Sequence, residues 1–255
     1  MDLQGRSVIV TGGAGGLGAA TARHFVGLGV ATVVVDMNEA GVAQVCDELG
    51  PLAVGVPGSI LEEADVAHAV EVAQGLGTFS LVANVAGGGI AGRTVARDGT
   101  PHPLDDYRRV IELNVVGTFN VSRLAAAAMA GNEPDENGER GVIVQTASIA
   151  GIEGQSGQVA YASAKGGIIG MTLPMARDLA VIGVRVMTIA PGTMGTPIMK
   201  SMPDAMREPL VAQIQFPKRL GEPEEFALLI EQIARTPYLN GEVIRLDGAL
   251  RFPPK

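Results

Sequence analysis

Residues 11–18 read Thr-Gly-Gly-Ala-Gly-Gly-Leu-Gly, between an apolar run that ends at Val10 and a helical pattern that starts at Gly16. Glycine permits positive φ and lets the main chain approach a ligand closely. The N-terminus of the following helix offers unpaired N–H groups and a favourable dipole to a pyrophosphate. A glycine-rich turn alone is a weak signal, so the strand–turn–helix context is what predicts a dinucleotide-binding turn here.

Apolar strand-like runs and helical patterns alternate along the rest of the chain. Strands are predicted at residues 7–11, 31–36, 51–56, 79–84, 141–147, 184–190 and 242–246. Helices are predicted at residues 16–28, 39–49, 61–75, 104–130, 158–181, 205–214 and 223–235. Runs such as 142–144 are apolar on both faces, as in parallel strands between two helical layers. The pattern predicts an α/β fold with a doubly wound parallel sheet of about seven strands and helices on both faces.

Composition narrows the class of protein. The chain has 255 residues, 47% hydrophobic and 18% charged, which suits one globular domain over residues 1–255, and no repeat or linker divides it. The formal net charge of −8 argues against a nucleic-acid surface, which needs clustered basic residues. A small anionic ligand is still possible, because a helix N-terminus can hold one. No metal site is predicted.

The ends of the chain and its one cysteine bear on location. No apolar run reaches the ~20 residues needed to cross a bilayer, so no membrane association is expected. A strand pattern begins almost at the first residue, which argues against a signal or transit peptide and predicts a cytoplasmic protein. Because Cys46 is the one cysteine of the sequence, no intrachain disulfide can form. The apolar residues that recur around it at helical spacing favour a buried structural thiol over a reactive one.

Three stretches are predicted to lie outside the regular elements. Residues 93–103 and 131–140 are rich in turn formers and polar side chains, and we expect surface loops there. Residues 193–218 show no clear strand and carry Gly, Pro and Met. This third stretch, called the lid below, is predicted to be a mobile cover over a substrate site.

Asp36 ends the second predicted strand, 18 positions after Gly18. A carboxylate at this place accepts hydrogen bonds from the adenosine ribose hydroxyls and repels a 2′-phosphate. No Arg or Lys occurs at residues 12–15 or 37–38 to offset that repulsion, so the pattern favours NAD over NADP. Asp36 can at the same time serve as a helix N-cap.

Tyr161 and Lys165 lie four positions apart and therefore share one face of a predicted helix. A free tyrosine has a pKa near 10, and a nearby ammonium lowers it towards the range useful for proton transfer. Tyr-x-x-x-Lys alone is common by chance and usually marks a solvated helix face. It gains weight from Ser148, which ends a predicted strand where open α/β sheets border a ligand crevice. Asn114 taken alone indicates only a buried amide bonded to the main chain.

These elements together resemble the short-chain dehydrogenase family. The positions that match its Thr-Gly-x-x-x-Gly-x-Gly pattern are Thr11, Gly12, Gly16 and Gly18. Residues 84–87 match its Asn-Asn-Ala-Gly element, with Val85 as a departure. The resemblance covers essentially the whole chain, including residues 189–193 and 240–248. It implies a Rossmann fold and an NAD-dependent oxidoreductase.

The resemblance also implies catalytic roles. Tyr161 would be the acid/base that exchanges a proton with the substrate oxygen, and Lys165 would lower its pKa and bind the nicotinamide ribose. Ser148 would orient the substrate oxygen, and Asn114 would hold a water in a proton path to solvent. Gln158, one helical turn before Tyr161, lines the substrate pocket or is simply a polar residue at a helix N-terminus. The implied substrate residues are thus Ser148, Gln158 and Tyr161.

The cofactor-binding residues follow the same pattern. Those implied are Gly12, Gly15, Gly16, Leu17, Gly18, Asp36, Met37, Ser59, Ile60, Asn84, Ala86, Gly87, Tyr161, Lys165, Pro191, Gly192, Thr193 and Thr196. Residues 191–193 would pass near the nicotinamide, with Thr196 placed for its amide or phosphate. The sequence departs from the family after the third strand, where an adenine-contacting Asp is often found. Ser59 would have to replace it.

A narrower likeness concerns the substrate. Residues 132–135, 146–150, 171–179 and 216–221 look like the type 2 3-hydroxyacyl-CoA dehydrogenases, a branch whose members also act as 17β-hydroxysteroid dehydrogenases. The resemblance implies oxidation of 3-hydroxyacyl-CoA to 3-oxoacyl-CoA. The lid adds basic and apolar residues that suit CoA phosphates and an acyl chain: Lys200, Arg207, Lys218, Arg219, Met194, Ile198, Met199 and Met202. The alternative is ordinary surface charge and lid packing.

Other functions stay open at this point. Within enzymes, the substrate can be a steroid, a polyol or a 3-oxoacyl-carrier-protein, because sequence outside the site can stay similar while the substrate changes. In another class, the chain is a redox-sensing NAD-binding scaffold without catalysis, which would have no need of all four catalytic side chains. The family is usually tetrameric through its two long helices, here 104–130 and 158–181, so a homotetramer is expected.

Overall fold

The structure is a computed structural model that describes residues 1–254, except for the side chain of Ile198. Seven strands form one sheet in the order β3-β2-β1-β4-β5-β6-β7, and neighbouring strands are parallel. The strands are β1 (Arg6–Thr11), β2 (Ala31–Asp36), β3 (Ala53–Pro57), β4 (Thr78–Asn84), β5 (Gly141–Thr146), β6 (Val184–Pro191) and β7 (Val243–Leu246). The predicted doubly wound parallel sheet is confirmed.

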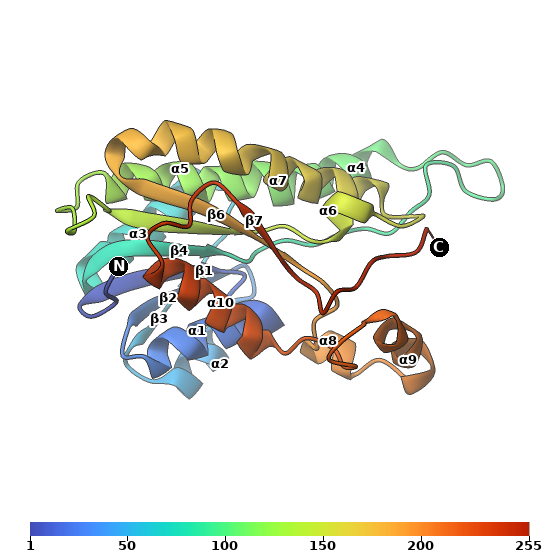
Figure 1. Ribbon diagram of the computed structural model, residues 1–255, viewed down its shortest axis with the longest axis horizontal. Helices are drawn as coiled ribbons and strands as arrows, with labels where there is room; N and C mark the ends of the chain where they lie inside the picture. The colour runs from blue at the N-terminus through green and yellow to red at the C-terminus, as the bar shows by residue number, and fades with distance from the viewer. Residues whose placement is uncertain (255) are drawn as a thin grey trace.

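Helices cover both faces of the sheet (Figure 1). One layer contains α1 (Gly16–Gly27), α2 (Glu39–Leu49) and α10 (Pro223–Arg235). The other contains α3 (Glu63–Leu76), α4 (Leu104–Ile111), α5 (Gly117–Met129) and α7 (Val159–Leu179). Each layer buries its own core against the sheet: Val121 and Met175 belong to one cluster, Phe25 and Phe226 to the other. Burial on both faces explains why the strands are apolar throughout.

The strand order places a ligand crevice. β1 lies between β2 and β4, so the chain winds away from it in two directions. In open α/β sheets, ligands bind outside the carboxyl ends of the strands at such a reversal. Thr11, Asp36 and Asn84 end three of these neighbouring strands.

The helix predicted at residues 104–130 is interrupted, and this prediction needs correction. A π-helical segment, Glu112–Val116, separates α4 from α5. The Asn114 side chain explains it, because its Nδ2 donates to the Val110 carbonyl oxygen over 2.8 Å, the acceptor that an α-helix reserves for the Asn114 main-chain N–H. Single π turns are frequent at functional sites.

Other boundaries differ from the prediction for local reasons. β3 begins at Ala53 rather than residue 51, because Gly50, with φ +76, and the Ala53 N–H to Gly50 carbonyl bond form a turn first. Two helices of four residues each were not predicted, α6 (Ala150–Glu153) and α8 (Pro197–Lys200), since such lengths show no period. The lid contains α8 and α9 (Asp204–Gln213) and no strand.

The loop predicted at residues 131–140 is not wholly a surface loop. Glu139 is only 5% exposed, and its carboxylate pairs with the buried guanidinium of Arg185 over 2.7 Å. Its acidic neighbours lie on the surface as expected. Among the described residues, no helix is long and apolar enough to cross a membrane.

Candidate active site

The glycines of the turn at residues 11–18 are required by close main-chain packing. Gly12 has φ +66, and a Cβ on it would lie 2.8 Å from the main chain of Ala86. A Cβ on Gly18 would lie 2.0 Å from the Gly12 carbonyl oxygen. Gly15 is the N-cap of α1 and makes no side-chain cap, so the first N–H groups of the helix are left for a ligand. A pyrophosphate fits this cradle.

Asp36 stands at the rim of a cavity of about 350 Å³ beside this turn. Its carboxylate accepts the Ala14 N–H over 3.2 Å and the Asn38 N–H over 3.0 Å. No Lys or Arg is among the described residues that line this cavity, so nothing there would neutralise a 2′-phosphate. Asn38, not Asp36, is the N-cap of α2, because its side chain accepts the Gly41 N–H.

Most of the expected cofactor residues line this cavity. They are Gly12, Gly15, Gly16, Leu17, Gly18, Asp36, Met37, Ile60, Ala86 and Gly87. Ser59 is an exception, because its hydroxyl accepts the Leu61 N–H and its own N–H donates to Asp65, while Gly58 lines the wall in its place. The hydroxyl that would have to replace the family's adenine-contacting Asp thus already accepts a main-chain N–H, and the adenine contact of Ser59 stays a prediction.

Asn84 supports the wall from behind. Its side chain is buried, and Nδ2 donates to the Ser122 hydroxyl over 3.1 Å. The Thr11 hydroxyl accepts the N–H groups of Val85 and Ala86 over 3.1 and 3.2 Å. The end of β4 is thus tied to the end of β1, which fixes the wall of the cofactor cavity.

A second cavity of about 350 Å³ continues the first and contains the catalytic candidates. Both cavities are lined by Leu17, Val85 and Gly87, so they are two ends of one crevice. The expected residues at this end are Ser148, Tyr161, Lys165, Pro191, Gly192, Thr193 and Thr196. Ser148 and Tyr161, which are 13 positions apart in the sequence, therefore meet in a cavity beside the phosphate turn.

Lys165 is buried in the floor of the crevice. Its Nζ donates to the Thr146 carbonyl oxygen over 2.8 Å and lies 5.7 Å from the centre of the Tyr161 ring. Burial lowers the pKa of Lys165 from 10.5 to about 8, because the charged ammonium loses water. A carbonyl and a nearby ring compensate only in part for that loss.

Burial also raises the pKa of Tyr161, and a hydrogen bond with Ser148 opposes the rise. Lys165 was expected to lower the pKa of Tyr161, but desolvation has the largest influence on that pKa here. The Ser148 hydroxyl is held in turn by the Ala150 N–H over 3.1 Å. At neutral pH the phenol is therefore protonated, and it is hydrogen-bonded to the Ser148 hydroxyl.

Asn114 supports the part of the cavity wall that Gly88 forms. Its Nδ2 donates to the Gly88 carbonyl over 2.7 Å, and its Oδ1 accepts the Gly88 N–H over 3.3 Å. A Cβ on Gly87 would lie 2.6 Å from Asn114 Oδ1 and 3.1 Å from Lys165 Nζ. A side chain at residue 87 would therefore collide with the Asn114 amide and crowd the Lys165 ammonium, so the position requires glycine.

Gln158 does not line either cavity among the described residues. It is the N-cap residue of α7, and its Oε1 accepts the Gln155 N–H over 2.9 Å. Of the two interpretations of Gln158, a polar residue at a helix N-terminus agrees with this position, and its contact with substrate stays a prediction. The sequence did not single out six further lining residues: Val35, Gly58, Gly88, Leu113, Thr146 and Ala147. All but Leu113, which lies in the π-helical segment, are near strand ends, and position is the one signal that could have found them.

The basic residues of the lid are largely paired with the chain's own acids. Lys200 pairs with Glu222 over 2.9 Å, Arg219 pairs with Glu225, and Arg207 pairs with Asp204. Lys218 differs, because its Nζ donates to the Ala212 carbonyl over 3.3 Å. Met194 and Met199 line the catalytic cavity, Met202 does not, and the Ile198 side chain lies outside what is described.

Comparison with known proteins agrees with this geometry. The family described as short chain dehydrogenase matches residues 6–207. The chain is 49% identical to human 3-hydroxyacyl-CoA dehydrogenase type-2, over 99% of this chain and 98% of that protein. It is 47% identical to the Drosophila melanogaster protein of that name, over 96% and 97%. The crystal structure of 3-hydroxyacyl-CoA dehydrogenase type-2 from Mycobacterium avium superposes with a TM-score of 0.95 at 49% identity, covering 99% and 98% of the two chains.

The glycine turn, the convergence of Ser148, Tyr161 and Lys165, and full-length similarity lead to one conclusion. The chain belongs to the short-chain dehydrogenase family, and it is an oxidoreductase of the kind that uses a nicotinamide cofactor.

Proposed function

We propose that this chain is an NAD-dependent oxidoreductase that interconverts 3-hydroxyacyl-CoA and 3-oxoacyl-CoA. The observation that carries the chemistry is the meeting of Ser148, Tyr161 and Lys165 in one cavity that continues the phosphate-binding cavity. The substrate class is supported by relatives whose names state it, at up to 49% identity over nearly the full chain. NAD is supported by the Asp36 carboxylate in a cavity lining without Lys or Arg among the described residues.

Tyr161 exchanges the proton. In reduction its phenol donates a proton to the ketone oxygen as that carbon is reduced, and in oxidation its phenolate takes the hydroxyl proton. A bound nicotinamide supplies or accepts the hydride. Because burial raises the pKa of Tyr161, the phenol is the form present at neutral pH, which suits reduction. Oxidation should gain as pH rises.

The remaining residues orient these groups. The Ser148 hydroxyl, which bonds to Tyr161, is placed to donate to the substrate oxygen once a substrate replaces that contact. The Lys165 ammonium, 5.7 Å from the centre of the Tyr161 ring, would stabilise the phenolate and bind the nicotinamide ribose. Asn114 holds the main chain at Gly88 and thereby the wall opposite Lys165. We retain its proposed role in a proton path to solvent.

A substrate panel tests the proposal. NADH oxidation should be measured by absorbance with acetoacetyl-CoA, a 3-oxoacyl-carrier-protein, a steroid ketone and a small ketone. Acetoacetyl-CoA should give the highest kcat/KM, and NADPH should serve poorly. A better steroid or carrier-protein substrate would overturn the substrate class and leave the chemistry intact. Binding of NADH without turnover of any ketone would instead favour the non-catalytic scaffold.

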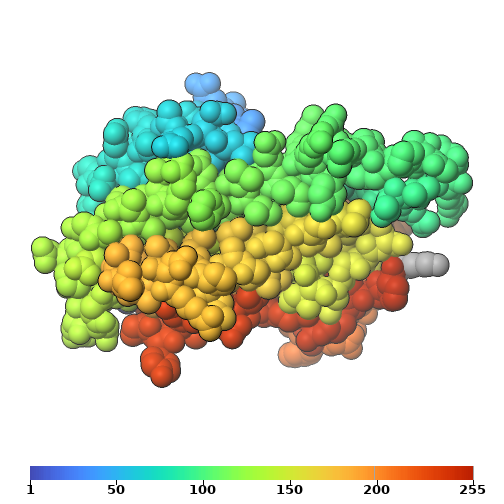
Figure 2. Space-filling view, turned by 90° about the horizontal axis from the view of Figure 1, so that it is seen from above, coloured from blue at the N-terminus to red at the C-terminus, as the bar shows by residue number. Residues whose placement is uncertain are grey.

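We also propose a homotetramer in the cytoplasm. Figure 2 looks onto the face where the green helices α4 and α5 lie beside the yellow to orange α7. Large apolar side chains are exposed on this face, at Val116, Phe119, Val159 and Leu173. Such a patch favours association with another copy. Light scattering should give four times the chain mass, Phe119→Glu should reduce it, and cell fractionation tests the location.

A further inference from the structure

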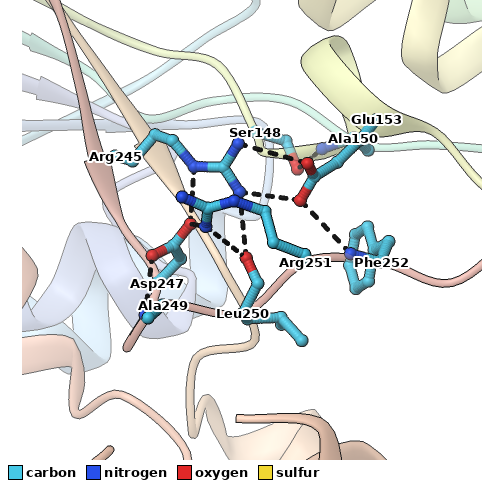
Figure 3. A network of polar contacts seen from close by, with 9 residues as sticks. All are labelled: Ser148, Ala150, Glu153, Arg245, Asp247, Ala249, Leu250, Arg251 and Phe252. Carbon is cyan, nitrogen blue, oxygen red and sulfur yellow. Dashed lines mark hydrogen bonds and ion pairs between the residues drawn. The ribbon is translucent and has the colours of Figure 1, made fainter. Parts of the chain in front are cut away.

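Arg245, on β7, joins segments that are far apart in the sequence (Figure 3). Its guanidinium bonds to both carboxylate oxygens of Glu153, at 2.7 and 3.3 Å. Its Nε donates to Asp247 over 2.7 Å, and its NH2 group also donates to the Leu250 carbonyl over 2.9 Å. A planar guanidinium can make this set of directed bonds, which a lysine ammonium cannot.

Glu153 is the last residue of α6, a four-residue helix that begins two positions after Ser148. The first turn of this segment closes on Ser148, because the Ala150 N–H donates to its hydroxyl over 3.1 Å and the Gly151 N–H to its carbonyl over 3.0 Å. A helix of one turn is not stable by itself. Tertiary contacts have to hold it: Ala150 is buried, a Cβ on Gly151 would lie 2.7 Å from the main chain of Lys165, and at the far end Glu153 meets Arg245.

Asp247 extends the same connection to the end of the neighbouring strand β6, where the Ile149 N–H already donates to the Pro191 carbonyl over 3.1 Å. Its side chain is 7% exposed, and it packs where a Cβ on Gly192 would lie, at 2.8 Å from its own Cβ. The Gly192 N–H donates to the Leu246 carbonyl over 2.9 Å. Arg245 therefore bridges the turn that carries Ser148 and the loop that lines the crevice at Gly192.

The end of the chain reinforces this connection. The Phe252 N–H donates to Glu153 over 3.2 Å, and the Pro254 carbonyl accepts the Ser156 N–H over 3.2 Å. In Figure 1 the chain from β7 onward runs back beside α6. The segment from Asp247 to Pro254 thus lies against the main chain between Ser148 and Tyr161.

We propose that Arg245 and Glu153 are positioning residues for catalysis: their ion pair fixes the turn that aims the Ser148 hydroxyl at the substrate oxygen. The inference rests on the proposed role of Ser148. The pair is well suited to stay formed, because the hydrogen bond from Arg245 holds the pKa of the Glu153 carboxyl below its usual range. Neither side chain lines the described crevice, so each acts through the turn.

The first test compares Glu153→Ala with a matched control. Glu153→Ala should lower kcat for acetoacetyl-CoA reduction about 10- to 100-fold, since a catalytic group displaced by about 1 Å can cost that much. The Kd for NADH should change less than about twofold, because Arg245 keeps its bond to Asp247 beside Gly192 and the phosphate turn makes no contact with Glu153. Arg251→Ala removes a 59% exposed arginine that pairs with the same Asp247 and does not touch Glu153, and it should keep kcat within about twofold. Equal losses in both variants would overturn the proposal.

A double-mutant cycle separates positioning from a general structural effect. In a Ser148→Ala background, Glu153→Ala should cause no further loss of the single-turnover rate, measured with enzyme in excess. Independent, multiplying losses would overturn the proposal and leave the function intact. A Ser148→Ala protein as active as wild type would instead reject the role of Ser148. If Glu153→Ala does not fold, Glu153→Gln keeps the side-chain shape, and Arg245→Lys should share its loss of kcat.

Discussion

The phosphate turn at residues 11–18 and the lid at residues 193–218 meet across the crevice, yet they are held by opposite means. In the turn the main chain packs on itself, so that a Cβ on Gly18 would lie 2.0 Å from a carbonyl oxygen. In the lid, α9 has no buried residue among those described, and exposed ion pairs such as Lys200–Glu222 hold the surface. The turn leaves little freedom for change and suits an unvarying cofactor. The lid leaves more freedom and suits the choice of substrate.

The largest effect on kcat is expected at Tyr161, which lies in the crevice between the turn and the lid and exchanges the proton. Tyr161→Phe removes only the phenolic oxygen and should lower kcat about 10²–10⁴-fold. The Kd for NADH should stay within about threefold, because the phosphate turn is untouched. Stopped-flow turnover and NADH fluorescence titration measure the two quantities. A variant that keeps more than about a tenth of the wild-type kcat would exclude Tyr161 as the acid/base.

One methyl group added to each region tests the comparison directly. Gly18→Ala should destabilise the protein by about 1–3 kcal/mol or more and weaken NADH binding, because the new Cβ collides with rigid main chain. Gly195→Ala in the lid places its Cβ 3.1 Å from the movable Cε of Lys200 and should change stability by less than about 0.5 kcal/mol. Thermal unfolding and NADH titration give the result. Similar effects at both sites would remove the distinction between turn and lid.

Stability should also depend on pH through Lys165. Its pKa is about 8 in the folded protein against 10.5 as the ordinary value, so between these values the unfolded chain binds more protons than the folded chain. Stability therefore rises with pH in this window. Compared with Lys165→Met, the wild type should gain about 2 kcal/mol in the free energy of unfolding from about pH 7.5 to about pH 9.5. Urea unfolding measures this quantity. If the difference in the free energy of unfolding between wild type and Lys165→Met did not change with pH, the Lys165 ammonium would not be desolvated in the folded protein.

Asp36→Ala tests cofactor choice at the edge of the turn. Loss of an acceptor for the ribose hydroxyls should weaken NAD about tenfold, since hydrogen bonds to a charged group contribute about 1.5–3 kcal/mol. NADP should improve relative to NAD, because the repulsion of its 2′-phosphate disappears. The ratio of kcat/KM for the two cofactors is the measurement. Equal losses with both would assign Asp36 to the support of Ala14 and Asn38.

The smallest effects are expected in the lid. Lys218→Ala should raise KM for acetoacetyl-CoA about twofold without changing kcat, because its ammonium bonds to a carbonyl and has charge left for a CoA phosphate. Lys200→Ala should do less, since Glu222 already neutralises that lysine. Added salt should raise KM for the CoA ester and leave a truncated thioester unaffected. Equal kcat/KM for the two substrates would exclude CoA-phosphate binding by the lid.

The sequence predicted the regular elements well because they depend on local pattern. All seven strands are found, with ends shifted by at most two residues, because buried parallel strands are apolar throughout. The failures come from particular side-chain contacts. The π segment depends on the Asn114 amide, which competes for the Val110 carbonyl four positions earlier and also bonds to Gly88, 26 positions away. The burial of Glu139 depends on Arg185, 46 positions away. No local period signals either contact.

The candidate site divides in the same way. Glycine spacing, Asp36 and the order of Ser148, Tyr161 and Lys165 are visible in the sequence itself, so the sequence alone was enough to predict these residues, and all of them line the crevice. Only the tertiary structure decided that the Asn114 side chain reaches the main chain of Gly88, that Glu222 neutralises a lid lysine, and that Arg245 reaches Glu153 across 92 positions. The physical reason is that hydrogen bonds and ion pairs depend on distance in space, which strand order sets and sequence spacing does not.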